Sequence, residues 1–228
     1  WIANRNNPLT ARVMGNRVWR WHFGRGLVST PDNFGKLGEK PSHPELLDWL
    51  AAWFVENGWS VKKLNALILN SATFQMSSMP NVATLKIDPT NLLLSRAPLR
   101  RMEAEPLRDS LLQISGQLDL KVGGTIWTFE NYKLVFNHTS EDATTYSSNR
   151  RAIYLPVIRN HVYDLFELFD FPDPGTVNGN RADTTIAPQA LYLMNSPLVL
   201  RTCATMAKQL LAEKKLTNAQ RVEWLYEK

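Results

Sequence analysis

Five polar residues that could do chemistry lie close together in the sequence around a glycine-rich loop: Asn16, Arg17, His22, Asp32 and His43. A histidine can act as a general base when a carboxylate orients it, and an arginine can bind an anionic group. Glycines in the loop would allow a ligand to approach the backbone closely. The pattern therefore defines a candidate polar site.

The same residues also have a structural interpretation. A buried polar loop must find hydrogen-bond partners for its backbone, and Asn16 and Arg17 could supply them while His22 is a partner within the core. The spacing matches no known nucleophile or metal motif. We therefore expect this segment to fix a corner of the fold. The alternative is a hydrolase-type enzyme, whose site would also draw on Arg101, Glu103 or Arg159.

Metal and cofactor binding have little support. The four histidines are far apart, and a single cysteine excludes an intrachain disulfide and Cys-based zinc or haem motifs. Asp170, Asp173 and Asp183 are oxygen ligands of the type calcium prefers, but they lack the EF-hand alternation. We expect no metal and no cofactor in this chain, with these aspartates as weak calcium candidates. Cys203 falls on a predicted inward helical stripe, which indicates a buried thiol.

The chain is rich in tryptophan, with eight in 228 residues. Trp21, Trp49 and Trp53 fall on or near predicted helical stripes and are expected in the core. Trp59 and Trp127 lie in or beside turns. Because indole faces stack on sugar rings and aromatic burial drives interfaces, these two are candidate contacts for a polysaccharide or a protein partner.

Helices must position most of these residues. Apolar residues recur with helical spacing in eight segments, namely 8–23, 43–57, 61–71, 107–118, 162–169, 188–194, 197–210 and one from 218. Ser42 with Glu45, and Thr217 with Gln220, have the spacing of capping boxes. Pro106 fits only in the first turn of its helix. Residues 76–91 read as a surface connection.

The predicted fold class is mainly α: a multi-helix globular domain with a small β insertion around residues 119–158. That insertion is rich in β-branched and aromatic residues around turn signals, which predicts two or three short strands. We expect a single domain over 1–228, with helical halves at 1–118 and 159–228. The chain starts at Trp1 without a leader and stops within a helix, so we expect a fragment of a longer multidomain protein.

The charge permits contact with polyanions, since the formal net charge is +5 and the sequence pI about 9.4. The basic residues are scattered, however, and the densest cluster, 96–109, is interleaved with carboxylates. Segments 43–57 and 61–71 imitate a helix-turn-helix, but the second offers few outward polar groups. We expect no nucleic-acid partner. No apolar run reaches the roughly 18 residues of a membrane span.

Several long strings in the chain are distinctive: "NPLTARVMGNRVWRWHFGRGLVSTPDNFGKLGEKPSHPELLDWLAAWFVENGWSVKKLNALILNSATFQMSS", "RRMEAEPLRDSLLQISGQLD", "RRAIYLPVIRN", "LFELFDFPDP" and "TTIAPQALYLMNSPLVL". Together they cover nearly the whole chain. They resemble the planctomycete-specific domain family known as domain of unknown function 1553. The string "TVNGNRAD" departs from the arginine- and threonine-rich link expected before the last of them.

The resemblance implies a setting rather than a chemistry. Members are similar to large exported bacterial proteins in which this domain follows a second domain of unknown function, often behind a cytochrome-c-like module. The family has no established catalytic residues to carry over. We therefore expect a non-catalytic interaction or scaffold module of an exported protein, with its neighbouring domains or a polysaccharide as partners.

Overall fold

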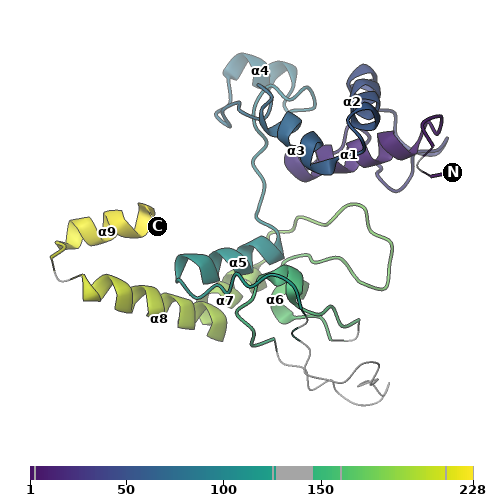
Figure 1. Ribbon diagram of the computed structural model, residues 1–228. Helices are drawn as coiled ribbons and strands as arrows, with labels where there is room; N and C mark the ends of the chain where they lie inside the picture. Colours follow the sequence, from purple (N-terminus) through teal and green to yellow (C-terminus); the bar gives the residue numbers. More distant parts are fainter. Residues whose placement is uncertain (3, 125, 127–145, 160, 214, 228) are drawn as a thin grey trace, which may run out of the picture. The chain divides into compact units, whose positions relative to one another are not determined.

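The computed structural model describes residues 1–228 except for residues 3, 125, 127–145, 160, 214 and 228. The described chain is mainly helical, as predicted (Figure 1). Its elements are α1 (Thr10–Phe23), α2 (Pro44–Glu56), α3 (Val61–Leu69), α4 (Val82–Ile87), α5 (Ala104–Ile114), the 3-10 helix η1 (Ala152–Tyr154), α6 (Asp164–Leu168), α7 (Ala187–Asn195), α8 (Pro197–Ala212) and α9 (Asn218–Glu227).

Contacts divide the chain into two compact units. Unit 1 comprises Trp1–Arg101 together with the short segment Val177–Asn180, and unit 2 comprises Met102–Thr176 and Arg181–Lys228. The first boundary between the units thus follows Arg101. From the sequence we expected the first helical half to end at residue 118. Unit 1 is discontinuous in sequence.

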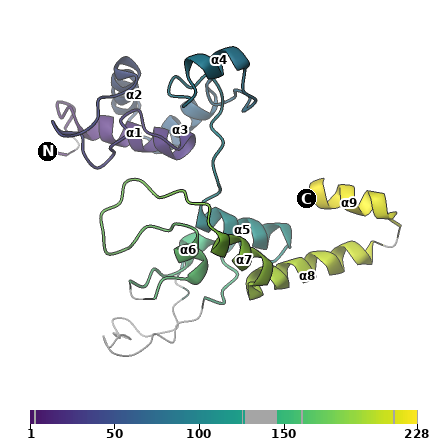
Figure 2. The same cartoon turned by 180° about the vertical axis from the view of Figure 1, so that it is seen from behind.

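Unit 1 is built on α1, which packs against both α2 and α3 (Figures 1 and 2). Each helix contributes an apolar stripe to one core, with Val18, Phe54 and Leu64 almost wholly buried. Next to Val18, the ring of Trp19 stacks on that of Phe23, with 4.3 Å between the centroids. Burial of these side chains holds the three helices together.

Local signals set two of the helix ends in unit 1. Gly24 ends α1 in the left-handed conformation, with φ +78° and its N–H donating to Arg20 O. The Ser60 hydroxyl caps α3 by accepting from Lys63 N. The predicted capping box at Ser42 is wrong: His43 is the N-cap of α2, and the Ser42 hydroxyl instead donates to Leu27 O. A tertiary contact has taken the group that would have capped the helix.

The expected surface connection at 76–91 is also wrong, because it contains α4. Asn81 caps this short helix by accepting from Ala83 N, and no residue of α4 is buried. After the helix, the Asp88 carboxylate accepts from Leu92 N and Leu93 N at 2.8 and 2.7 Å. The apolar pattern gave no signal because so short a helix buries no stripe.

Unit 2 packs α5 against α6, α8 and η1 around Leu112 and Leu165. Pro106 lies in the first turn of α5, where it removes no helical hydrogen bond. Arg108 is almost completely buried, and its guanidinium donates to Ser148 O and, at 2.8 Å, to Arg150 O. A charged side chain thus ties the segment before η1 to α5.

Helix α8 is buried only near its start, at Leu198, Val199 and Thr202. Cys203 is exposed, so the prediction of a buried thiol is wrong. The helix extends beyond α5, α6 and α7 within unit 2, which leaves its distal stripe uncovered by these helices (Figures 1 and 2). The predicted capping box of α9 is confirmed, since Thr217 N donates to Gln220 Oε1 and Gln220 N to Thr217 Oγ1.

The predicted β insertion at 119–158 is not confirmed. Within it, the described residues have η1 and the isolated bridge between Asp119 and Arg150, but no strand. Residues 125 and 127–145, which include Trp127, lie outside the described part of the chain. Among the helices that are described, none has the length and apolarity needed to cross a membrane.

The core of unit 1 predicts a large difference between two leucines of α3. Leu64→Ala should lower the free energy of unfolding by about 2–5 kcal/mol, because it leaves a cavity at a fully buried site. Leu69→Ala is the matched control, at a 41 % exposed position, and should change it by about 0.5 kcal/mol or less. Tryptophan fluorescence can follow this unfolding, since six of the eight tryptophans belong to unit 1. Equal effects of the two variants would contradict the packing described.

The turn after α4 predicts a low carboxyl pKa. The hydrogen bonds from Leu93 N–H and Leu92 N–H hold the pKa of Asp88 below its ordinary value. Since the folded pKa is depressed, the stabilisation is present above the unfolded pKa of about 3.9 and is lost as the pH falls through the folded pKa. In an NMR titration, the Leu92 and Leu93 amide resonances should move with a midpoint below about 3.9. A midpoint at or above that value would contradict the turn.

Candidate functional site

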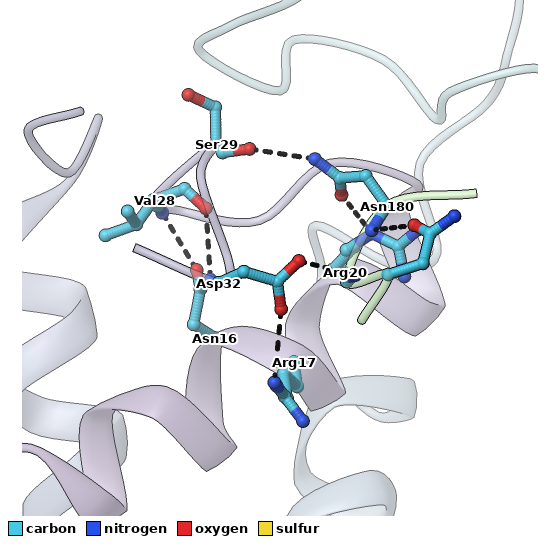
Figure 3. A network of polar contacts seen from close by, with 9 residues as sticks. Asn16, Arg17, Arg20, Val28, Ser29, Asp32 and Asn180 are labelled. Atoms are coloured by element: carbon cyan, nitrogen blue, oxygen red, sulfur yellow. Dashed lines mark hydrogen bonds and ion pairs between the residues drawn. The ribbon is translucent and has the colours of Figure 1, made fainter. Parts of the chain in front are cut away.

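Asn16 ties the glycine-rich loop to α1. Its side chain is fully buried and pairs with both backbone groups of Val28: Nδ2 donates to Val28 O at 3.0 Å and Oδ1 accepts from Val28 N at 2.8 Å (Figure 3). Gly26 allows this approach, because a Cβ there would lie 2.7 Å from Asn16 Oδ1 and 2.5 Å from Val28 O. The structural role expected for Asn16 is what the contacts show.

Asp32 holds a second chain segment against the same loop. Its carboxylate accepts from Gly179 N at 2.5 Å and lies 3.4 Å from Arg17 Nη2 (Figure 3). The neighbouring Asn180 accepts from Arg20 Nε at 2.6 Å and donates to Ser29 O at 3.0 Å. Asp32 is therefore engaged by the backbone amide of Gly179 and by the guanidinium of Arg17.

The two histidines of the predicted site lie in other contacts. His22 Nε2 is 2.8 Å from Asn65 Oδ1, and its ring meets Phe74 edge to face. His43 Nδ1 is 2.9 Å from the Ser42 hydroxyl. The described partners of these histidines, Asn65 and Ser42, are thus not those of Asp32, which are Arg17 and Gly179. The structure joins Arg17 to Asp32 but does not assemble a base and its orienting carboxylate from the predicted residues.

The other candidates of the hydrolase alternative are divided between the units. Arg101 belongs to unit 1, while Glu103 and Arg159 belong to unit 2. Glu103 lies 3.1 Å from Arg181 Nη1, and Arg159 is exposed.

Unit 2 has its own groove, of about 610 Å³, and three carboxylates are among its lining residues. Glu105 accepts from both terminal nitrogens of Arg181, at 2.6 and 2.7 Å, and this pairing raises the pKa of Arg181. Asp109 accepts from Ala152 N at 2.7 Å. Glu103, the third carboxylate, forms an ion pair with Arg181. All three carboxylates are thus engaged in structural contacts rather than held ready for proton transfer.

The weak calcium candidates do not form a metal site in the part of the chain that is described. Asp170 accepts from the backbone and hydroxyl of Thr184, and Asp173 accepts from Gly175 N within its own turn. Among the described residues there is no group of three or more His, Cys, Asp or Glu that could hold a metal ion.

Unit 1 has a groove lined by three tryptophans, Trp19, Trp49 and Trp53, which we call the tryptophan groove. It measures about 590 Å³ and is formed by residues of α1, α2, α3 and the turn after α3. Its lining consists of Trp19, Leu46, Trp49, Leu50, Trp53, Lys63, Ala66, Leu67, Ile68, Asn70, Ser71 and Thr73. Trp19 is buried, whereas Trp49 is 53 % exposed. The groove therefore has an apolar floor with an indole open to solvent.

These positions correct the tryptophan predictions. Trp49 and Trp21 were expected in the core, yet both are about half exposed, at 53 % and 50 %. Trp53 is partly buried against the core, in line with its helical stripe. Trp59, predicted as an exposed contact, instead packs edge to face on Phe54, with 5.4 Å between the ring centroids. A helical stripe wider than its partner helix leaves its outer members uncovered, and Trp49 is such a member.

Four of the residues that line the tryptophan groove are polar: Lys63, Asn70, Ser71 and Thr73. Asn70 Nδ2 donates to Ala66 O at 2.7 Å, and the Ser71 hydroxyl donates to Ile68 O at 2.6 Å. Both side chains are thus held in place by the C-terminal turn of α3. An apolar floor with a few fixed polar groups is typical of ligand grooves, whose volumes run from roughly 300 to 1,000 Å³.

Some sequence signals for the tryptophan groove were present. Trp49 and Trp53 are four residues apart on α2, a spacing that places side chains on one helix face. The role of Gly179 and Asn180 had no comparable signal, since their partners lie 147 and 151 residues away in the sequence.

The structural role of Asn16 predicts a cost in stability. Asn16→Leu keeps a similar shape but leaves Val28 N–H and C=O without partners, at about 1–3 kcal/mol for each buried group. The free energy of unfolding should fall accordingly in denaturant titrations. The control is Arg17→Met, whose ion pair is half-exposed and should contribute about 1 kcal/mol or less. A destabilisation no larger than that of the control would argue against the loop contact.

Comparison with known proteins gives a family but no characterised relative. No curated protein and no solved structure matches the chain. One family does match, over residues 1–228: PSD1, described as "Protein of unknown function (DUF1553)". Since the match spans the whole sequence, this chain belongs to that family of unknown function.

Proposed function

We propose that this chain is a non-catalytic binding module whose ligand groove is the tryptophan groove of unit 1, and that its ligand is a carbohydrate chain. The observation that carries the proposal is the position of Trp49, 53 % exposed at the groove, with Trp53 one helical turn further on. An exposed aromatic side chain at a groove that is also lined by a few polar groups is a common mark of a ligand site.

The chemistry of the tryptophan groove favours a sugar over a purely apolar segment. A pyranose ring presents a C–H face that can lie against an indole, while its hydroxyl groups need hydrogen-bond partners at the rim. Asn70 and Ser71 supply an amide and a hydroxyl there, already oriented by their bonds to α3. Groups that are fixed before the ligand arrives lose less conformational entropy on binding.

The contacts at the predicted polar site also support a binding role over the hydrolase alternative. Hydrolysis by acid–base chemistry needs a carboxylate or imidazole placed to transfer a proton. Asp32 is engaged by Arg17 and Gly179, and His22 by Asn65. The carboxylates of the unit 2 groove are likewise engaged by Arg181 and by backbone amides.

The proposal includes the setting that the family resemblance implies. The module would be part of a larger exported bacterial protein and would present a carbohydrate to, or hold it beside, the neighbouring domains of that protein. Neither a cofactor nor a nucleic acid is part of the proposed function.

Oligosaccharide binding by the full chain tests the proposal. Neutral and acidic hexasaccharides are titrated while tryptophan fluorescence and thermal unfolding are recorded. We expect at least one to bind, and at 100 times its dissociation constant it should add about 2.7 kcal/mol to stability. Trp49→Ala should weaken this binding about 30-fold, the equivalent of about 2 kcal/mol for an aromatic anchor.

The control variant is Trp21→Ala, which removes an equally exposed indole of unit 1 that does not line the groove. It should leave the affinity within about twofold, and both variants should unfold within about 1 kcal/mol of the original protein. Equal loss of affinity in the two variants, or no binding of any hexasaccharide, would contradict the proposal. Accumulation of shorter sugar products would favour the hydrolase instead.

A further inference from the structure

The charges of the chain are divided unevenly between its two units. Unit 1 holds 13 of the 26 lysine and arginine residues but only 6 of the 21 aspartates and glutamates, a formal net charge of +7. Unit 2 holds 13 and 15, a net charge of −2. The overall value of +5 thus conceals a strongly basic unit, and it is the unit that carries the tryptophan groove. A positive potential there attracts anionic ligands and raises their local concentration.

Most arginines of unit 1 whose contacts are described have a structural partner. Arg12 Nε lies 2.6 Å from Asp48 Oδ1, Arg17 pairs with Asp32, and Arg100 donates to Trp21 O at 2.6 Å. These cations are occupied in holding the fold. The binding of an external anion must therefore come from other basic residues of the unit.

Lys63 is the one charged residue among the lining residues of the tryptophan groove. It is exposed on α3, and no described carboxylate lies within ion-pairing distance of its ammonium group. Its neighbour Lys62 is also exposed but does not line the groove. A cation beside an indole floor offers two complementary contacts: a face for an apolar ring surface and a charge for an acidic group.

We propose that the ligand of the tryptophan groove is an anionic polysaccharide, with a sugar ring on the indole of Trp49 and its carboxylate or sulfate group against Lys63. This inference rests on the proposed carbohydrate-binding function and specifies the class of carbohydrate. The polar groups at Asn70 and Ser71 bind hydroxyl groups of the same or the next sugar. The net charge of unit 1 attracts the polyanion to the groove, and Lys63 binds the acidic group of one of its sugars.

The arrangement suits a sugar polyanion better than a nucleic acid. Nucleic-acid binding depends on several lysines or arginines that follow successive phosphates. The tryptophan groove provides one cation beside its three indoles. A polysaccharide with one acid group for each sugar or pair of sugars needs no more than this at a groove of about 590 Å³.

The test compares two chemically matched ligands on the full chain. Hexagalacturonate carries carboxylates, and its fully methyl-esterified form has the same sugar chain without the charge. Calorimetric titration should give about tenfold weaker binding for the ester, because it cannot form the charge-assisted contact. A κ-carrageenan hexasaccharide, which carries sulfates but no carboxylates, provides the sulfate arm, and the tighter of the two acidic ligands identifies the preferred anionic group. A 12-nucleotide single-stranded DNA serves as the other polyanion.

Lys63→Gln should weaken the binding of hexagalacturonate about tenfold and leave the affinity for the ester unchanged. In the matched control Lys62→Gln, the affinity for hexagalacturonate should stay within about twofold of the original. The affinity for the acidic ligand should fall with rising salt in the original protein and much less in Lys63→Gln. Both lysines are exposed, and circular dichroism confirms that the variants are folded.

The outcomes separate the inference from the proposed function. If ester and acid bind equally and Lys63→Gln has no effect, while Trp49→Ala still weakens binding about 30-fold, the anionic class is overturned and the carbohydrate module stands. If none of the sugars binds, both proposals fail. Tighter binding of the DNA than of any hexasaccharide, with loss in Lys63→Gln, would overturn the carbohydrate assignment in favour of nucleic acid.

Discussion

The buried amide of Asn16 is the contact on which the arrangement of unit 1 depends. By pairing with both backbone groups of Val28, it fixes the chain after α1 against that helix and brings Leu27 and Val28 into the core. Leu27 O then accepts from both the amide and the hydroxyl of Ser42, directly before α2. The direction in which α2 starts, and with it the place of Trp49, follows from this short series of hydrogen bonds.

The sequence predicted some features of the fold better than others. Helix ends determined by neighbouring residues were predictable: Gly24 ends α1, Ser60 caps α3 and Thr217 pairs with Gln220 at α9. Such signals act within one turn of helix and need no tertiary structure. Ser42 has the same local pattern, but a partner 15 residues earlier took its hydroxyl. Cys203 failed for a related reason, because a helical stripe is buried only where another element covers it.

The features of the candidate sites also differ in how far the nearby sequence predicts them. The residue types around the first loop were enough to predict that Asn16 ties the loop down, because an amide beside a buried loop has few other uses. The tryptophan groove could be anticipated in part from the helical spacing of Trp49 and Trp53, but the exposure of Trp49 depends on which part of α2 its neighbours cover, and the sequence of α2 does not specify that. Gly179 and Asn180 were beyond reach, since nothing near them in the sequence indicates Asp32 or Ser29 as partners.

The segment 177–180 has a consequence for the order of folding. Asp32 and Gly179 are 147 residues apart, and closing a flexible loop of that length costs about 4 kcal/mol in chain entropy. A few exposed hydrogen bonds, at about 0.5–1.5 kcal/mol each, can offset this cost only after helices on both sides of the segment have formed. The helices of unit 1 have short-range contacts and can assemble first, whereas this segment joins them late. On the native protein the same imbalance makes it the first part of unit 1 to detach, so that α1–α3 can remain folded while the 177–180 segment opens and closes.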